Sequence, residues 1–355
     1  MKRWLPALLG IAALGGFAGF AATRDRGAAP ARRHAAAPPP VSHSADSAQW
    51  QSVATLQPGS APFGLIGDAV MGSGGQSFVL DVMERRIGIA GADGAVAWTG
   101  RAGRGPGEFF VPVALAADAD LLYVLDRGNR RIERYRTAGG RLQRSGSLPL
   151  EFGPEDLCVS EGRLFVLGAH RGQAIHEVSP RDGRVLRSFA PDAQLSDDLL
   201  ATFRAGGYLA CGGGDHLAFL PLLRPEVRLF SAATGALLHT ATLPGYNAVV
   251  VRRTADAVEF RAEGGTHDTG ASVIPLGDGR MLVQTGAVRP GAATAHEFTS
   301  IRSYVVDWRQ GSARVLGGAL PRIAALRDGW ALALDTDPQP AVRRLRLSLS
   351  SAAPS

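Results

Sequence analysis

The chain has 355 residues, 45% of them hydrophobic and only 20% charged, so it is apolar enough to bury a core. Its net charge of +6 comes from scattered single arginines, without a block of five like charges or arginines interleaved with stacking aromatics, which argues against nucleic acid as a partner. The 45 glycines and 22 prolines are typical of many tight turns between short strands. The two cysteines, Cys158 and Cys211, have a spacing that fits no metal motif, and they form either one disulfide or two buried thiols.

The first 48 residues are predicted to lie outside the fold. Lys2 and Arg3 precede an unbroken apolar run over residues 4–22, the pattern of an export signal. The run is just long enough to span a bilayer, so residues 1–23 are either a cleaved signal peptide or an N-terminal membrane anchor. Residues 24–48, rich in Ala and Pro, are predicted to be a disordered linker. The protein is thus expected in the periplasm or outside the cell, and residues 4–22 would tether it to the inner membrane if they are retained.

An internal repeat organises the rest of the chain. The segment FVLDVMERRIGIAGADG, which starts at Phe78, aligns without a gap on YVLDRGNRRIERYRTAG, which starts 45 residues later at Tyr123. A third copy starts at Phe165 and needs a small insertion, and Arg131–Pro149 aligns with Glu226–Pro244. A period of this length is typical of a four-stranded β-propeller blade.

The repeat predicts an all-β, six-bladed β-propeller of four-stranded antiparallel blades. The expected units are residues 62–103, 108–149, 152–190, 200–244, 246–320 and 321–350. The fifth unit is overlong and is predicted to contain an inserted hairpin or loop, and the sixth lacks one strand. Trp50–Leu56 alternates like a strand and is expected to complete the sixth blade, which removes both edges of the ring. The propeller is therefore placed at residues 49–350, followed by a tail at 351–355.

Within a unit, the strands and turns are distinguished by their residue patterns. Apolar runs such as LLYVLD predict buried inner strands, whereas the alternation in RIERYR (residues 131–136) predicts a half-buried strand. The tripeptides AGG, ADG, RDG and ATG predict hairpin turns, because Gly adopts positive φ without a penalty.

The second unit resembles an NHL repeat, whose pattern is a glycine-rich opening, an apolar strand and a Y/F-V-x-D-x-x-N-x-R-I core. The residues that fill this pattern are Gly103, Gly105, Gly107, Phe109, Pro112, Tyr123, Val124, Asp126, Asn129, Arg131 and Ile132. The first unit keeps Asp81, Arg86 and Ile87 but has Glu84 where Asn is expected, and the third has lost both the Asp and the Arg. The resemblance covers residues 50–350 as architecture and about 60–165 as motif.

This resemblance changes the interpretation of the glycine cluster in GRGPGE. A dinucleotide-binding loop opens a helix, whereas a strand follows here, so the cluster is interpreted as a loop between blades. Asp126 and Arg131 are predicted to support the turns through charge-assisted hydrogen bonds. The resemblance also implies an enzymatic alternative, since some NHL-like propellers are lyases with His-bound zinc and others are lactonases that hold calcium. Others bind RNA, which the predicted export argues against.

A site in a propeller is expected in its axial funnel, where the inner strands and their loops meet. The candidate binding residues there are Arg127, His170, Asp215, His216 and His267. The last four are also the donors nominated for a zinc ion, because imidazoles from several blades could supply its ligands. His176 and His239 are predicted to lie at the surface. The sequence contains no nucleophile elbow, no H-E-x-x-H and no EF-hand loop.

The sequence therefore favours an exported, non-enzymatic scaffold that binds a protein, peptide or glycan in the cell envelope and acts as a monomer. The alternative is a metal-dependent lyase or hydrolase, amidating-lyase-like or lactonase-like, that uses the axial funnel. No cofactor is predicted for the scaffold, and zinc or calcium is the cofactor of the alternative.

Overall fold

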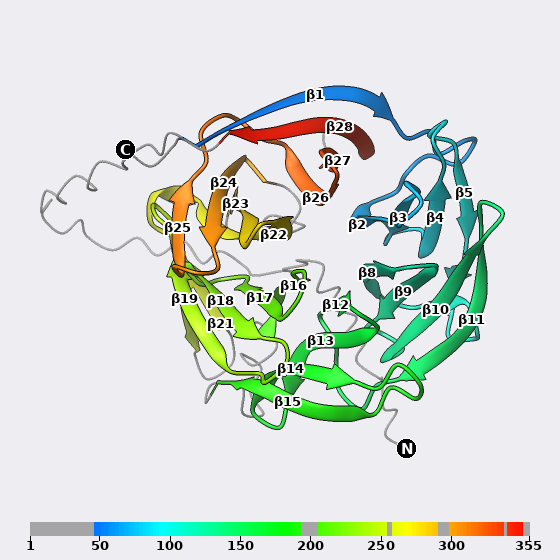
Figure 1. The fold of residues 1–355 in the computed structure, drawn as a ribbon, viewed down its shortest axis with the longest axis horizontal. Coiled ribbons are helices and arrows are strands. Elements are labelled where there is room, and N and C mark those ends of the chain that lie inside the picture. Colours follow the sequence, from blue (N-terminus) through cyan, green and yellow to red (C-terminus); the bar gives the residue numbers. More distant parts are fainter. Residues whose placement is uncertain (1–45, 193–204, 254–257, 290–297, 337–338, 351–355) are drawn as a thin grey trace, which may run out of the picture.

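The computed structural model describes residues 46–192, 205–253, 258–289, 298–336 and 339–350. These residues form six four-stranded antiparallel sheets in a ring around a central axis, so the predicted all-β, six-bladed propeller is confirmed (Figure 1). The predicted signal or anchor, nearly all of the predicted linker and the tail lie outside the described residues. No described helix has the length and apolarity needed to cross a membrane.

The first three blades are each built from four consecutive strands, ordered from the axis outward. Blade 1 contains β2 (Ile66–Met71), β3 (Ser77–Asp81), β4 (Arg86–Ala90) and β5 (Val96–Thr99). Blade 2 contains β8 (Pro112–Asp118), β9 (Leu121–Asp126), β10 (Arg131–Ala138) and β11 (Arg141–Pro149). Blade 3 contains β12 (Asp156–Ser160), β13 (Arg163–His170), β14 (Gln173–Val178) and β15 (Val185–Pro191). Between blades 1 and 2 lies a short parallel pair, β6 (Arg101–Ala102) and β7 (Glu108–Phe109).

The remaining three blades complete the ring. Blade 4 contains β16 (Gly207–Cys211), β17 (His216–Pro221), β18 (Glu226–Ser231) and β19 (Leu237–Thr242). Blade 5 contains β22 (His267–Gly277), β23 (Arg280–Val288), β24 (Ser300–Asp307) and β25 (Ser312–Val315). Blade 6 contains β26 (Arg322–Arg327), β27 (Trp330–Asp335), β28 (Ala341–Ser350) and, from the start of the chain, β1 (Ser47–Thr55). The predicted insertion before blade 5 is confirmed as a hairpin of β20 (Val250–Arg253) and β21 (Val258–Arg261), followed by the 3-10 helix η2 (Glu263–Gly265).

The strand β1 closes the ring, as its alternating sequence predicts. It pairs antiparallel with β28 on the outer rim, where the first and last described strands lie side by side (Figure 1). Its start bonds to blade 5, where Ala48 N donates to Gly317 O at 3.1 Å. Its end reaches blade 1, where Gln57 N donates to Gly94 O at 2.8 Å. The segment of β1 and the residues just after it therefore contacts blades 5, 6 and 1.

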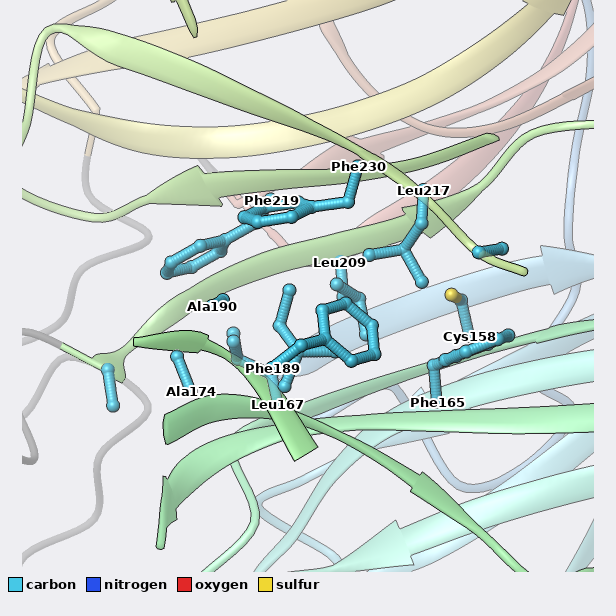
Figure 2. Packing of buried hydrophobic residues seen from close by; sticks show 13 residues of the cluster. Cys158, Phe165, Leu167, Ala174, Phe189, Ala190, Leu209, Leu217, Phe219 and Phe230 are labelled. Carbon is cyan, nitrogen blue, oxygen red and sulfur yellow. The ribbon is translucent and has the colours of Figure 1, made fainter. Parts of the chain in front are cut away.

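The hydrophobic core is distributed around the ring instead of forming one centre. Six clusters of buried residues are present, and each joins side chains of two neighbouring blades. Between blades 3 and 4, for example, Phe165 and Phe189 face Phe219 and Phe230 across the interface (Figure 2). Both faces of each sheet are thus covered by a neighbouring sheet, which explains why the second strands are nearly continuous apolar runs.

This arrangement corrects the prediction that residues 131–136 form a half-buried strand. Ile132 packs toward blade 3 and Tyr135 toward blade 1, so both faces of β10 are buried. Glu133 is fully buried too, and its carboxylate pairs with Arg131 at 2.9 Å and with Arg144 at 2.6 Å. The alternation in this strand reflects buried ion pairs and not exposure to solvent.

Candidate functional site: the central channel and the loop face

The antiparallel blades sort their connections onto two faces of the ring. Connections from the second to the third strand, and from each outermost strand to the next blade, lie on one face, which we call the loop face. Connections from the first to the second strand, and from the third to the fourth, lie on the opposite face, which we call the turn face. The long connection over residues 100–111 and the β20–β21 hairpin belong to the loop face, whereas first-to-second-strand turns such as 119–120 and 328–329 are only two residues long.

The motif residues of blade 2 build the loops of this face. The buried Asp126 accepts hydrogen bonds from Phe110 N and Val111 N, both at 3.0 Å, and from the backbone and side-chain nitrogens of Asn129 at 3.2 and 2.6 Å. The Arg131 guanidinium donates to the carbonyl oxygens of Gly105 at 2.6 Å and of Glu108 at 2.8 Å. The predicted supporting role of Asp126 and Arg131 is therefore seen directly, and the glycine cluster is a loop between blades.

The five predicted site residues do not come together. Arg127, His170 and His267 lie at strand ends on the loop face, whereas Asp215 and His216 lie on the turn face, because they precede the second strand of blade 4. None of the five is among the residues that line the central channel, and whether any of them binds a partner stays a prediction.

Each of these residues has local contacts instead. Arg127 Nη1 bonds to Glu155 Oε2 at 3.1 Å, and His170 Nε2 lies 3.2 Å from Glu151 Oε1. Asp215 accepts from Ser231 Oγ at 2.6 Å and from Ala233 N.

The two other histidines are separated as well. His216 packs on Trp308 with ring centroids 4.7 Å apart, and His267 is buried at the start of β22, where burial lowers its pKa. Within the described ranges, no three His, Cys, Asp or Glu side chains are grouped so that they could hold a metal ion. The four nominated donors therefore do not fit a zinc site.

His176 corrects another prediction, since it is fully buried and not at the surface. Its Nε2 bonds to Gly168 O at 2.9 Å and its Nδ1 to Ser188 Oγ at 2.8 Å, so both ring nitrogens have a partner. Burial lowers the pKa of His176 to about 4. His239 lies on the outermost strand β19 and is partly exposed, as predicted.

The central channel holds polar groups that the sequence analysis missed. Its cavity of about 300 Å³ is lined by the innermost strand of every blade, and the lining is mostly apolar. The titratable groups in its lining are Asp68, Glu155, Asp156, Tyr208, Arg322 and Arg327. Single aspartates inside the apolar strands IGDAVM and DLCVS are the sequence signal that could have located them.

The two aspartates connect neighbouring blades. Asp68 Oδ2 in β2 accepts from Leu115 N in β8 at 2.8 Å, and Asp156 Oδ2 in β12 accepts from Leu209 N in β16 at 2.7 Å. An amide does the same between blades 5 and 6, where Gln284 Oε1 accepts from Ile323 N at 2.7 Å. Blades 1, 3 and 5 thus each supply a side-chain acceptor to the innermost strand of the following blade.

Burial dominates the electrostatics of the channel. It raises the pKa of Asp68 despite the charge of Arg322, and it raises that of Asp156 well above its usual range, with the charge of Asp68 as a further cause. Burial also raises the pKa of Glu155 to about 7, against the opposing effect of Arg127. The Arg322 Nε donates to Ala271 O of the neighbouring blade at 3.2 Å. Asp68, Asp156 and Arg322 therefore each bond to the backbone of a neighbouring blade.

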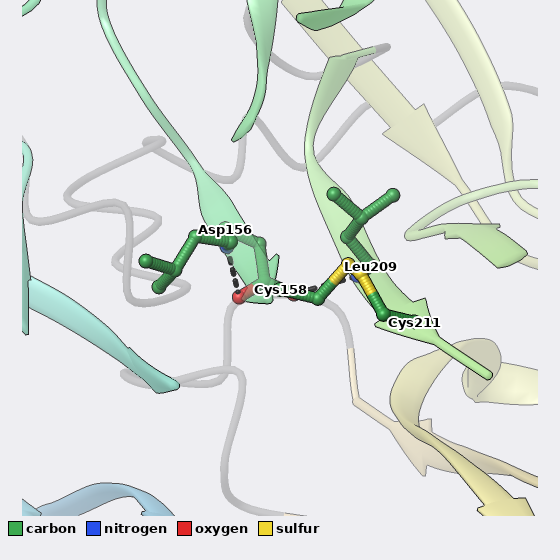
Figure 3. The surroundings of a disulfide bond; sticks show 5 residues. Asp156, Cys158, Leu209 and Cys211 are labelled. Carbon is green, nitrogen blue, oxygen red and sulfur yellow. Dashed lines mark hydrogen bonds between the residues drawn. A yellow bond between two sulfur atoms is a disulfide. The ribbon is translucent and has the colours of Figure 1, made fainter. Parts of the chain in front are cut away.

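A disulfide joins the same pair of innermost strands as Asp156. Cys158 of β12 and Cys211 of β16 are bonded, with their Cα atoms 5.6 Å apart, two residues along each strand from the Asp156–Leu209 hydrogen bond (Figure 3). Of the two alternatives left by the sequence, the disulfide is the one present.

No family model matches the chain, and no curated protein matches it either. Solved structures do resemble it. A Bacteroides fragilis protein with the provisional name of an exported protein superposes with a TM-score of 0.56 at 9% identity, covering 86% of this chain and 96% of the other. The WD40 repeats of RRP9 superpose with a TM-score of 0.54 at 13% identity, covering 84% of this chain and 100% of the other. At these identities the likeness establishes the propeller fold alone.

Proposed function

We propose that this propeller is a non-enzymatic binding scaffold that acts outside the cytoplasm and contacts a protein, peptide or glycan partner through its loop face. The observation that carries the proposal is the unequal construction of the two faces. The loop face bears the long connection over residues 100–111 and the β20–β21 hairpin, whereas the turn face is built largely from tight turns. Binding residues concentrate on loops held by a rigid scaffold, and the six inter-blade cores supply that rigidity.

The enzymatic alternative has less support. The donors nominated for a metal are split between the two faces, and the channel carboxylates of Asp68 and Asp156 each accept a backbone hydrogen bond from an adjacent strand, whereas Glu155 pairs with Arg127. A catalytic site needs its groups to converge on one reacting atom, and the described residues offer no such convergence around a metal. The scaffold function is therefore the one that the geometry favours.

Export and repeat origin are parts of the same proposal. The disulfide between Cys158 and Cys211 supports folding in an oxidising compartment. The Asp126 and Asp81 carboxylates, each tying a second-to-third-strand turn to the preceding loop, support an NHL-like origin for the first two blades.

Site-specific photo-crosslinking in the native host tests the scaffold function. A photoreactive residue would replace Met83 or Val250, which are 63% and 51% exposed on the loop face, or the matched turn-face residues Ala119 and Asp328. Discrete crosslinked products are expected from the loop-face positions only. Products confined to the turn face, or none from either face, would contradict the proposal.

A further inference from the structure

Arginine recurs in the same turn of three consecutive blades, where Arg130 and Arg171 are exposed and Arg85 is partly buried. Arg85, Arg130 and Arg171 each lie in the turn between the second and third strands of blades 1, 2 and 3, on the loop face. All three have left-handed backbone conformations, with φ of 54°, 48° and 50°. Glycine or asparagine adopts this conformation more readily, so the turn geometry itself does not call for arginine.

These arginines have no charged partner within the structure. Arg85, Arg130 and Arg171, together with Arg104 in the loop between blades 1 and 2, make no ion pair and no side-chain hydrogen bond among the described residues. The nearby Arg101, in contrast, pairs with Glu108 at 2.8 Å. Two exposed carboxylates, Glu84 and Glu151, lie on the same loops, and Glu151 contacts His170. These loops therefore keep a net positive charge that is open to an outside partner.

Apolar groups lie among the guanidinium groups. The Arg104 Cζ is 4.3 Å and the Arg85 Cζ 5.6 Å from the centroid of the half-buried Phe110 ring. A Cβ atom at Gly128 would lie 2.6 Å from Phe110 Cδ1, so the ring packs against the turn that carries Arg130. Met83, on the turn of Arg85, is 63% exposed. Arg85 and Phe110 are distant along the chain and come together only in the folded ring.

We propose that this arginine arc, defined as Arg85, Arg104, Arg130 and Arg171 with Phe110 and Met83, binds an acidic peptide segment of a protein partner. The proposal rests on the scaffold function proposed above and names its partner chemistry. Guanidinium groups bind carboxylates strongly, and the exposed Met83 offers contact to apolar side chains of a peptide. Nucleic acid is less suited, because a guanidinium already lies over the Phe110 ring on which a base would stack.

Fluorescence anisotropy with the full chain tests the arc. The probe is a labelled peptide of repeated Glu-Glu-Leu, about 12 residues long and so able to span roughly 40 Å when extended. The double variant Arg130→Glu/Arg171→Glu is expected to weaken binding by about tenfold or more, since it reverses two of the four unpaired charges. The matched control Arg181→Glu/Arg184→Glu makes the same double change at exposed sites on the turn face and should alter the affinity by less than about twofold.

Further variants and ligands in the same assay identify the class of ligand. Phe110→Ala is expected to weaken peptide binding, and Arg130→Lys/Arg171→Lys to restore part of the affinity lost in the glutamate variant. Equal affinity of wild type and the Arg130→Glu/Arg171→Glu variant would overturn the arc, as would tighter binding of dextran sulfate or poly-uridine than of the peptide. Failure of the wild type to bind the peptide, alongside clear loop-face crosslinks, would sink only this inference, whereas absence of those crosslinks would sink the scaffold function itself.

Discussion

Asp126 is a buried acceptor that holds the end of the loop between the first two blades. Its buried carboxylate receives four hydrogen bonds from Phe110, Val111 and Asn129. We expect Asp126→Ala to lower the free energy of unfolding by about 3 kcal/mol or more, because it leaves buried N–H groups without partners. Urea unfolding measures this, and Asp120→Ala, which removes an exposed ion pair with Arg136, should cost less than about 1 kcal/mol. Equal effects of the two substitutions would show that the network contributes little.

Glu155 gives the channel a specific pH dependence. Because burial raises its folded-state pKa from 4.5 to about 7, the folded protein holds this proton more tightly than the unfolded chain does. Its contribution to stability is therefore present at low pH and is lost as the pH rises from about 4.5 to about 7. Subtracting the unfolding free energy of Glu155→Gln from that of wild type at each pH isolates this change. A difference that is flat across the window would contradict the raised pKa.

His176 acts in the opposite direction. Its pKa falls from 6.5 to about 4 in the folded state, so the unfolded chain binds the proton more tightly. The stability due to the neutral ring is complete above about 6.5 and is lost as the pH falls toward about 4. In unfolding titrations, His176→Gln should lose less stability on acidification than wild type, although it is less stable at neutral pH. A variant that follows the wild-type acid profile would rule out this role.

At the scale of elements, the disulfide and Asp156 fasten the same two innermost strands. Cys158 and Cys211 are separated by 53 residues in sequence, and closing such a loop restricts the unfolded chain. Replacing both by alanine should lower the unfolding free energy by roughly 4 kcal/mol in the chain-entropy model. Calorimetry of the double variant measures the loss, and thiol titration of unreduced wild type should find no reactive cysteine. An unchanged midpoint would mean that the neighbouring hydrogen bond and core packing suffice.

Closure of the ring depends on the pairing of β1 with β28. Deleting residues up to Thr55 would leave β28 as an open edge and would remove the bond from Ala48 to Gly317 beside blade 5. We expect the truncated chain to unfold at much lower denaturant concentration and to aggregate, because an unpaired edge recruits other strands. Size-exclusion chromatography and urea unfolding test this. A soluble, monomeric truncation of near wild-type stability would show that the inter-blade cores close the ring by themselves.

The elements themselves could be predicted because each blade repeats the same local rules. Apolar runs indicate strands buried on both faces, and glycines at the ends of short polar segments indicate the turns. The period of 45 residues between FVLD and YVLD indicates the blade length. The strand over residues 131–136 was predicted to be half-buried because polar and apolar residues alternate in it. A pattern of letters cannot distinguish a polar side chain in a buried ion pair from one that is exposed to solvent. Burial on both sides follows only from the packing of whole blades.

At the scale of the molecule, the site was harder to predict than the fold, because convergence depends on which face each connection occupies. His216 and His267 are similar in sequence context, yet one precedes a second strand and the other a first strand, so they lie on opposite faces. The arginine arc was hidden for the same reason, since its members become neighbours only when successive blades align. Assigning each loop to a face from the order of the strands in its blade would have separated the loop-face residues from the turn-face residues.

The closing strand also determines how the ring would respond to tension. The chain preceding Asp46 leads directly into β1, so a mechanical load on that segment acts first on the hydrogen bonds that shut the ring and only afterwards on any blade. A pulling experiment from that end should therefore record an early rupture from release of β1, before the sheets themselves give way.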